Sequence, residues 1–374
     1  MEHITQKSHV KMKNKYKIAV VGTVGLPANY GGFETLVENL TTKDAPIDMI
    51  VFCSSKNYDY KLKTYKNASL IYLPIKANGI SSIFYDSISL LIATFKKTDS
   101  ILLLGVSGAC ILPIINLFYR GKIVTNIDGL EWKRNKWGKI TKYFLKFCER
   151  IAVKYSSAII ADNQAIADYV LQEYNIVSTV IAYGGDHAIS YPKKNNLNIL
   201  PIEYKEYSLA LCRIEPENNI HTILSSYSKT QENLVFIGNW DNSTYGKELK
   251  SKYSKYKNIK ILDPIYDIGT LFEIRKKCSV YIHGHSAGGT NPSLVEMMFF
   301  NKIIVCYDCS YNRSTTENKA IYFSNETELL KIINNRTNLN EDISRDMFQI
   351  ANDRYLWAIV KQQYLDLLIK KDFE

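Results

Sequence analysis

The feature that most constrains the fold is a repeated series of short apolar, β-branched runs separated by helix-length segments. In the first half the runs are KIAVVG, MIVFCS, LIYLP, ILLLG, KIVTNI, AIIADN and TVIAYGG. In the second half they are SLALCR, NLVFIGN, IKILD, SVYIHG, KIIVCYD and AIYFS. Strands that alternate with helices form βαβ units and a parallel sheet covered on both faces. The series therefore predicts an α/β fold with two Rossmann-like domains.

The length of the chain also favours two domains, because 374 residues exceed what one hydrophobic core usually holds. The polar stretch 184–205 is the expected connection, so we predict an N-terminal domain over 18–188 and a C-terminal domain over 189–374. Residues 1–17 are polar and basic and are expected to form a loose tail. A final helix over about 341–371 is expected to cross back onto the first domain.

The cysteines, one long uncharged stretch and the distribution of charge bear on the compartment, on membrane insertion and on possible partners. Seven scattered cysteines, an odd number, are typical of reduced thiols in the cytoplasm. The uncharged stretch 101–118 is nearly long enough to span a bilayer, but Gly105, Gly108 and Pro113 should divide it into a strand, a turn and a buried helix start. Residues 1–190 hold 23 basic and 15 acidic residues. This basic half is compatible with nucleic acid, anionic lipid or an anionic substrate.

Two glycine-rich loops each follow an apolar run and lead into a helix. They are GLPANYGGFET (25–35) and GHSAGGTNPSLVE (284–296). Backbone N–H groups at a helix start bind anions, and glycine lets a phosphate approach closely. In parallel sheets, ligands bind beyond the carboxyl ends of the strands, where such loops lie. A tight structural turn is the alternative for the first loop, because its glycines do not follow the dinucleotide-binding pattern.

Five stretches, in this order, carry a family resemblance: GLPANYGGFET, NIDGLEWKR, YGGD, RIEPENN and GGTNPSLVE. Together they resemble the GT-B glycosyltransferases of retaining family four, and within it the bacterial rhamnosyltransferases of capsule and O-antigen synthesis. The resemblance covers about residues 16–370. It implies two Rossmann-like domains facing across a cleft, with the nucleotide sugar bound mostly by the second domain and the acceptor by the first. It also implies sugar transfer with retention and without a metal or other cofactor.

The resemblance assigns roles to particular residues. Arg213 and backbone N–H groups would stabilise the leaving diphosphate, and Glu296 would accept hydrogen bonds from the ribose. The predicted donor-binding residues are Gly31, Gly32, Arg213, Glu217, His283, Asn291, Pro292, Ser293, Leu294 and Glu296. The predicted acceptor-side residues are Asn29, Tyr30, Phe33, Trp132 and Arg134. Asp128 and Glu131 are the predicted catalytic carboxylates. The alternatives are a turn aspartate beside Gly129 and a glutamate paired with Lys133 or Arg134.

Three positions depart from the family pattern. Gly288 stands where the family often has the first of two glutamates, Asn218 where it has a lysine, and Asp128 where it has a histidine. In the family the glutamate contacts sugar hydroxyls and the histidine reaches the 6-hydroxyl. An unpaired buried polar group costs about 1–3 kcal/mol, so a changed site is expected for a changed sugar. The departures favour a 6-deoxy donor such as dTDP-L-rhamnose.

A basic segment, GKITKYFLKFCERIAVK (138–154), leaves two interpretations open. Ile140, Phe144, Phe147 and Ile151 form an apolar stripe, surrounded by lysine and arginine. The helix could cover the sheet with its lysines solvated, or it could attach to anionic lipid. Segment 80–97 has the same ambiguity. The resemblance implies a lipid-pyrophosphate-linked saccharide acceptor, so the expected location is cytoplasmic and peripheral on the inner face of the membrane.

Other function classes are weakened or stay open. A nicotinamide-dependent oxidoreductase is disfavoured by the loop pattern, and a nucleic-acid partner by dispersed charge without a recognisable motif. No metal site is predicted: the CxxC of Cys306 and Cys309 has no second pair, and His283 and His285 have no evident third ligand. A glycosyltransferase for another UDP- or GDP-sugar, a nucleotide-sugar epimerase and an inactive sugar-nucleotide binder stay open.

Overall fold

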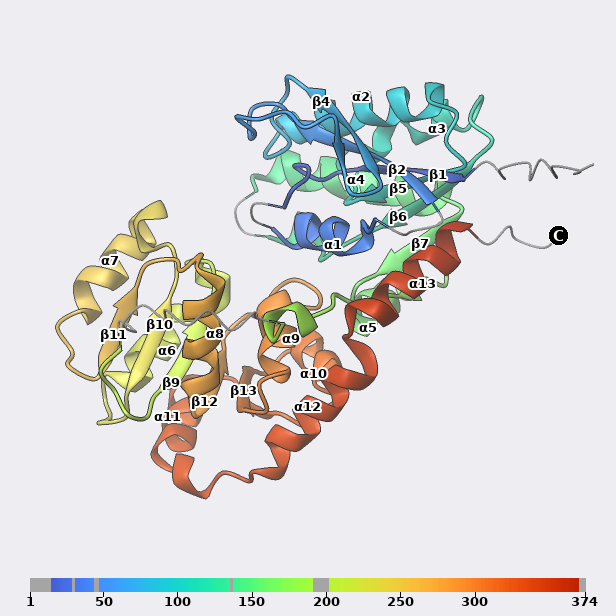
Figure 1. Cartoon of the computed structure of the whole chain (residues 1–374). Coiled ribbons are helices and arrows are strands. Elements are labelled where there is room, and N and C mark those ends of the chain that lie inside the picture. The colour runs from blue at the N-terminus through green and yellow to red at the C-terminus, as the bar shows by residue number, and fades with distance from the viewer. Residues whose placement is uncertain (1–14, 29–30, 44–46, 135–136, 191–201, 370–374) are drawn as a thin grey trace, which may run out of the picture.

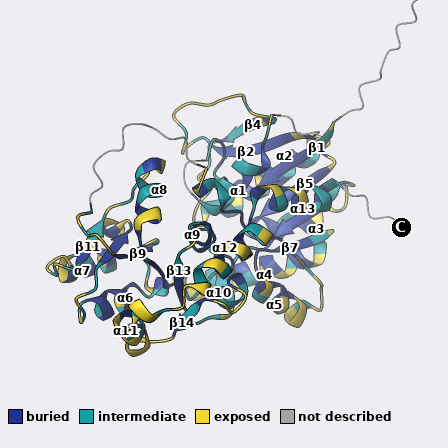
Figure 2. Cartoon of the chain, turned by 60° about the horizontal axis from the view of Figure 1, so that its bottom comes forward, coloured by how far each residue is buried: buried dark blue, intermediate teal, exposed yellow. Residues whose placement is uncertain are grey.

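The computed structural model describes residues 15–28, 31–43, 47–134, 137–190 and 202–369. These residues form two separate sheets, each sandwiched between helices (Figure 1). The interior strands of both sheets are almost entirely buried, while helices such as α2 (Ser81–Phe95) and α6 (Ile220–Tyr227) keep one face in solvent (Figure 2). This is the layered arrangement that βαβ units produce.

The first sheet has eight strands in the order β3-β4-β2-β1-β5-β6-β7-β8. Their bounds are β1 (Tyr16–Val21), β2 (Ile47–Ser54), β3 (Thr64–Tyr65), β4 (Ala68–Leu73), β5 (Ser100–Leu104), β6 (Lys122–Asn126), β7 (Ala158–Ala161) and β8 (Thr179–Val180). All neighbours are parallel except the short β3, which pairs antiparallel with β4.

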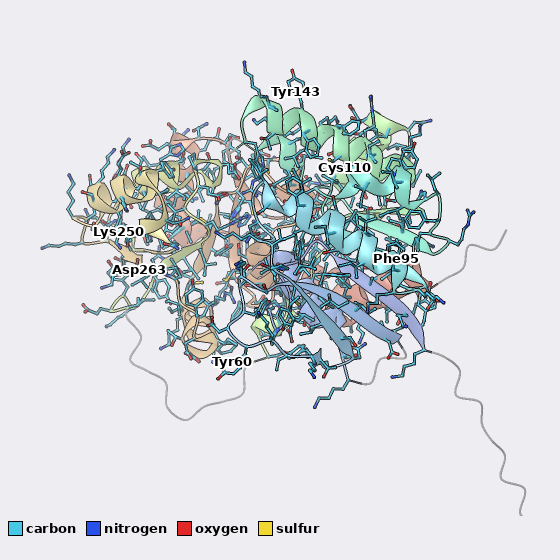
Figure 3. All side chains as sticks on the ribbon, turned by 90° about the horizontal axis from the view of Figure 1, so that it is seen from above. Tyr60, Phe95, Cys110, Tyr143, Lys250 and Asp263 are labelled. Carbon is cyan, nitrogen blue, oxygen red and sulfur yellow. The ribbon has the colours of Figure 1, made fainter. Side chains whose placement is uncertain are left out.

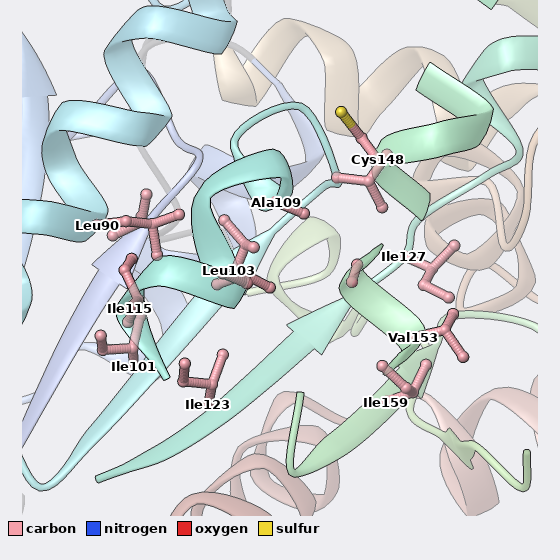
Figure 4. Packing of buried hydrophobic residues seen from close by; sticks show 14 of the residues in the cluster. Leu90, Ile101, Leu103, Ala109, Ile115, Ile123, Ile127, Cys148, Val153 and Ile159 are labelled. Atoms are coloured by element: carbon pink, nitrogen blue, oxygen red, sulfur yellow. The ribbon is translucent and has the colours of Figure 1, made fainter. Parts of the chain in front are cut away.

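Helices cover both faces of the first sheet. One face is packed by α2 (Ser81–Phe95), η1 (Ala109–Ile111), α3 (Leu112–Ile115), α4 (Lys139–Tyr155) and α5 (Gln164–Tyr174), and the other by α1 (Gly32–Leu40) and α13 (Trp357–Ile369). Side chains of alternate strand positions, such as Leu103 and Ile123, meet helix side chains such as Leu90 and Cys148 (Figure 4). Burial of these apolar side chains is what holds the domain together.

The second sheet has six parallel strands in the order β11-β10-β9-β12-β13-β14. The strands are β9 (Ser208–Leu211), β10 (Leu234–Ile237), β11 (Ile259–Leu262), β12 (Val280–His283), β13 (Ile303–Tyr307) and β14 (Ile321–Phe323). One face is covered by α6 (Ile220–Tyr227), α7 (Thr244–Tyr253) and α11 (Glu326–Asn334), and the other by α8 (Ile268–Lys277), α9 (Pro292–Met298) and α12 (Asp342–Arg354). α10 (Ser310–Thr315) precedes β14.

Short 3-10 helices connect these elements: η2 (Glu131–Lys133), η3 (Asp186–Ala188), η4 (Pro216–Asn218), η5 (Trp240–Asn242) and η6 (Arg336–Asn338). The predicted fold class is confirmed, and all thirteen predicted runs contain a strand. Without the short outer strands, each sheet has the doubly wound order 3-2-1-4-5-6. The topological switch point lies between β1 and β5 in the first sheet and between β9 and β12 in the second, and sheets of this kind bind ligands at that point.

The two chain ends differ from the prediction. Strand β1 begins at Tyr16, inside the predicted tail, because the Tyr16 hydroxyl donates to the backbone oxygen of Leu368 (2.9 Å) and the strand pairs with β2. The predicted single final helix is two helices, α12 and α13. They separate at Tyr355, whose backbone oxygen accepts from Gly185 N–H (2.9 Å). Helix α13 does cross onto the first domain, where Asn126 donates to the Tyr364 hydroxyl (2.7 Å).

Stretch 101–118 is divided as predicted, into β5, a turn and the short η1–α3 segment. Over the described residues, none of the helices combines the length and the hydropathy needed to cross a bilayer. The apolar stripe of segment 138–154 is not fully buried: α4 packs Leu145 and Cys148 onto the sheet and leaves Ile140 and Phe147 exposed.

Candidate ligand site between the two domains

The two domains meet through the loops that follow β7 and β12. The Asp162 carboxylate accepts from Thr290 N–H (3.0 Å), and the Thr290 hydroxyl donates to the Asp162 backbone oxygen. The Asn163 amide lies 3.2 Å from the Thr290 and Thr315 hydroxyls and from the Tyr311 backbone oxygen. All these contacts join the first domain to the second, so they fix how the carboxyl ends of the two sheets face each other.

Glycines allow the loops of the two domains to approach each other this closely. A Cβ atom on Gly129 would lie 2.8 Å from the Gly288 Cα, and one on Gly289 would lie 2.0 Å from the Asp162 carboxylate. Neither position has room for a side chain. Gly288 itself is different, because its φ of 115° requires glycine although nothing lies within 4 Å of its missing Cβ.

A second contact between the domains is an ion-pair network around Arg134. Its guanidinium donates to Glu217 (2.8 Å) and Glu215 (2.8 Å) of the second domain and to Glu131 (3.2 Å) of the first. Trp137 also donates to Glu131 (3.2 Å). The predicted acceptor residue Arg134, the predicted donor residue Glu217 and the predicted catalytic residue Glu131 thus lie together, with one guanidinium facing three carboxylates.

Arg213 follows β9 at the switch point of the second sheet. Its side chain is exposed and makes no hydrogen bond or ion pair with any described residue. It lies near His285, whose pKa is held well below its usual value by burial, by neighbouring His283 and by the charge of Arg213. An exposed guanidinium without a partner is suited to bind an anion.

His283 and His285 stack with ring centroids 4.4 Å apart, at the carboxyl end of β12. Burial lowers the pKa of His283 to about 3, so both rings are neutral at neutral pH. His283 Nε2 and His285 Nδ1 are buried and have no hydrogen-bond partner among the described residues. Buried polar atoms normally have partners, so these two nitrogens indicate a place where a polar ligand group can bind.

The buried residue Asn218 determines the shape of the Arg213 loop. Its side-chain amide donates to the Arg213 backbone oxygen (2.7 Å), and its N–H donates to the Glu215 backbone oxygen (3.0 Å). Asn218 thus holds the turn that presents Arg213, which is the only basic residue of 213–219.

Asp128 lies half-buried at a left-handed backbone position, φ 60°, after β6. Asn126 fixes this turn by accepting from the Asp128 N–H (2.9 Å). Burial and the neighbouring Glu131 carboxylate raise the pKa of Asp128 to about 6, against the opposing charges of Arg134 and Arg213. A carboxyl that titrates near neutral pH can both take up and release a proton, which is what acid–base chemistry requires.

Glu296 is paired within the structure. Arg275 donates to its carboxylate, and His187 Nε2 lies 3.3 Å from it. Burial would raise the pKa of Glu296, but Arg275 and His187 outweigh it and hold the pKa below its usual value. His187 Nδ1 accepts from the Trp357 indole (2.9 Å), which leaves its proton on Nε2, facing Glu296. Asp186 completes the junction by accepting from the Trp357 N–H (2.8 Å).

The start of α9 is capped from within. Asn291 accepts from the Ser293 N–H (3.1 Å) and hydroxyl (2.8 Å), and Pro292 occupies the first helical position. The N–H of Leu294 donates to the Asn291 backbone oxygen (3.1 Å), and its side chain is buried in the core. The amides predicted to bind a diphosphate are therefore partly engaged in the cap.

The first glycine-rich loop is also closed by its own side chains. The buried Glu34 carboxylate accepts from the Val24 N–H (2.7 Å) and the Thr23 hydroxyl (3.1 Å). Gly31 has φ 135°, and a Cβ atom there would overlap Glu34. Gly32 faces Tyr183 at ordinary van der Waals distance, and Phe33 is half-buried against the core. Asn29 and Tyr30, predicted on the acceptor side, lie outside the described residues.

Trp132 lies in a different environment from its predicted neighbours. Its indole donates to the buried Glu149 carboxylate (2.9 Å), and the Lys146 ammonium lies 4.7 Å from its ring centroid. The same glutamate accepts from Tyr169 (2.7 Å) and Tyr174 (2.6 Å). These contacts give Trp132 a packing role between α4 and α5.

Several residues of this junction were not predicted. Asp162 and Asn163 follow an ordinary apolar run. The only sequence signal for Asn163 is its place just before a helix, where asparagine is a common cap. Thr290 stands within the glycine-rich stretch 284–296, but its partners Asp162 and Asn163 are more than 100 residues away in sequence. No spacing pattern in the sequence identifies such contacts.

The arrangement of two doubly wound sheets, with α13 returning to the first, is the GT-B fold. A family model described as "Domain of unknown function (DUF1972)" matches residues 15–186, which lie in the first domain. No curated protein sequence matches the chain.

Solved structures of this fold cover nearly the whole chain. Sucrose-phosphate synthase from Thermosynechococcus elongatus matches with a TM-score of 0.74 at 11% identity, covering 94% of this chain and 98% of that one. A glycosyltransferase from Rickettsia africae matches at 0.69 and 14% identity, covering 95% and 98%. HepE of Anabaena in complex with UDP-glucose matches at 0.68 and 16% identity, covering 94% and 99%. At these identities the likeness establishes the fold.

Proposed function

We propose that this chain is a glycosyltransferase that binds a nucleotide-diphosphate sugar at the switch point of the second sheet. The observation that carries the proposal is Arg213, an exposed guanidinium without a partner beside the stacked His283 and His285. A diphosphate placed there would receive charge-assisted hydrogen bonds, and the unpaired histidine nitrogens could bind polar groups of the ligand. HepE, of the same fold, was solved with UDP-glucose.

In the proposed reaction, the bond between the anomeric carbon and the diphosphate oxygen breaks. A bond from that carbon to an acceptor hydroxyl oxygen forms, and the hydroxyl proton leaves. Arg213 would stabilise the negative charge on the departing nucleoside diphosphate. Asp128, with its pKa raised to about 6, is the group suited to take up the proton. Transfer with retention and without metal is part of the proposal and comes from the family resemblance.

We propose dTDP-L-rhamnose as the donor and a lipid-linked saccharide as the acceptor, used at the inner face of the membrane for surface polysaccharide. Gly288 supports the donor assignment, because no side chain contacts sugar hydroxyls from this position and the space beside it is open. Asp128, in place of a histidine, supports a donor without a 6-hydroxyl. The acceptor class and location come from the family resemblance.

Thermal unfolding of the pure protein with a panel of ligands tests this proposal. The panel contains UDP, dTDP, GDP, UDP-glucose, dTDP-L-rhamnose and NAD. A ligand at a hundredfold excess over its Kd stabilises the folded state by about 2.7 kcal/mol. Selective stabilisation by dTDP and dTDP-L-rhamnose is expected. Stabilisation by another nucleotide alone would retain the glycosyltransferase and discard rhamnose, and a response only to NAD would overturn both.

A further inference from the structure

Three neighbouring helices expose large apolar side chains on the outer face of the first domain. We call this set the apolar face; it comprises Phe84, Ile88 and Phe95 of α2, Ile114, Leu117 and Phe118 at α3, and Ile140, Tyr143 and Phe147 of α4. Ile140 is 86% exposed, Tyr143 78% and Phe95 76%. Tyr143 projects from α4 away from the molecule, and Phe95 lies at the end of α2 (Figure 3).

The three helices of the apolar face are neighbours, and aromatic stacking joins exposed side chains of α2 and the α3 region. Phe95 of α2 stacks on Phe118, with ring centroids 6.2 Å apart, and Asn116 beside α3 donates to the Tyr155 backbone oxygen at the end of α4 (2.8 Å). Figure 1 places α2 and α3 on the side of the first domain that points away from the second. Adjacent exposed apolar side chains of this size indicate an interaction surface, because isolated ones are the norm on a monomer.

The exposed charges around the apolar face are predominantly basic. The only acidic residues of the three helices are Asp86 and Glu149, and both are buried. The exposed charged residues on or just after these helices are, apart from Asp99, basic: Lys96, Lys97, Arg120, Lys139, Arg150 and Lys154. The second domain differs, since Lys250 of α7 pairs with Asp263 (3.1 Å; Figure 3) and Asp241 (3.0 Å).

We propose that the apolar face docks on an anionic lipid bilayer, with its aromatic rings at the interface and its basic side chains at the headgroups. Apolar and cationic groups on one helical face are what such surfaces bind. A second copy of the chain fits less well, because a twofold contact would place this basic face on itself. The inference rests on the lipid-linked part of the proposed function and deepens it.

The docking position relates the bilayer to the ligand site. Helix α4 begins at Lys139, five residues after Arg134 of the interdomain ion-pair network. Its exposed residues Ile140 and Tyr143 lie in the first two turns. A bilayer in contact with this end of α4 therefore lies beside the junction where the two domains meet, so an acceptor anchored in lipid would reach the junction from this side.

Flotation of the full chain with vesicles tests the proposal. One set of vesicles contains equal amounts of phosphatidylglycerol and phosphatidylethanolamine, and the other contains phosphatidylcholine alone. A charge variant carries Lys139→Glu, Arg150→Glu and Lys154→Glu, and an apolar variant carries Phe95→Ser, Tyr143→Ser and Phe147→Ser. The matched control carries Lys255→Glu, Lys257→Glu and Lys260→Glu in the second domain, where all three lysines are exposed.

The original chain should bind the anionic vesicles and not the neutral ones. The charge and apolar variants should each lose affinity by at least about tenfold, and the control variant should bind like the original chain. Equal binding of all variants, or no binding of the original chain, would overturn the proposal. So would a concentration-dependent dimer that only the apolar variant abolishes. Nucleotide-induced thermal stabilisation, measured on every variant, shows that each is folded and separates failure of this proposal from failure of the proposed function.

Discussion

The two glycine-rich loops look alike in sequence and differ in what they do with their polar groups. After β1, the buried Glu34 carboxylate satisfies Val24 and Thr23, so the described part of the loop is closed by its own side chains. After β12, Gly288 borders open space, and two histidine nitrogens have no partner among the described residues.

This difference in unpaired polar groups indicates which loop has room and partners for a ligand. Burying a polar group without a partner is costly, so the unpaired nitrogens of His283 and His285 are candidates for contact with a ligand. In the loop after β1, the Val24 N–H and the Thr23 hydroxyl both have the Glu34 carboxylate as their partner. At β9 and β12 of the second domain, the guanidinium of Arg213 and the rings of His283 and His285 remain available. Glycine content alone does not distinguish these two cases.

The largest expected effect comes from exchanging glycine for alanine in the segments that follow β1 and β12. A Cβ on Gly22, at φ 94°, would lie 1.9 Å from the Leu104 backbone oxygen, which cannot move away. We expect Gly22→Ala to lower the free energy of unfolding by about 4 kcal/mol, and Gly288→Ala, which meets only the φ penalty, by about 1–2 kcal/mol. Urea denaturation of both variants measures this. Equal losses would show that the loops are not different in kind.

Removing the unpaired charge should affect binding and leave stability unchanged. We expect Arg213→Ala to weaken UDP or dTDP binding by about 10- to 100-fold, because a charge-assisted contact to phosphate is lost. Its free energy of unfolding should stay within about 0.5 kcal/mol of the original, since the side chain is exposed. Titration calorimetry is the measurement, and Arg345→Ala, which removes an exposed arginine of α12, is the matched control. Unchanged nucleotide affinity would remove the main support for the proposed site.

The sequence predicted the sheets better than the junction between them. A run such as ILLLG or SVYIHG carries its strand signal locally, and every such run contains a strand. Arg213 and the β12 loop were placed correctly at the ends of strands, because parallel sheets put those ends together. Contacts such as Asp162 with Thr290 depend on residues 128 positions apart. The split between α12 and α13 likewise depends on Gly185, far from it in sequence.

The ion pairs across the domains should couple measurably. Arg134 is largely buried and faces three carboxylates, so Arg134→Ala would leave like charges together. We expect a loss of about 2 kcal/mol in the free energy of unfolding. A double-mutant cycle with Glu217→Gln should give a coupling of about 1 kcal/mol. Additive losses would mean that the contact does not hold the domains together.

The smallest effect concerns pH. The pKa of Asp128 is raised from its ordinary value of 3.8 to about 6, so the folded state binds the proton more tightly than the unfolded state does. Stability contributed by protonated Asp128 is therefore present below about pH 4 and is lost as pH rises to about 6. The original chain should lose about 1–2 kcal/mol relative to Asp128→Asn across this window. Urea denaturation at several pH values measures the difference, and a constant difference would contradict the raised pKa.

Hydrogen exchange measured with and without saturating UDP or dTDP shows directly which domain binds the nucleotide. We expect new protection of backbone amides in 213–219 and 284–294, at the switch point of the second sheet, and little change in 22–28 and 105–111. Protection confined to the loops of the first sheet would contradict it, because the nucleotide would then bind where the described polar groups already have their partners.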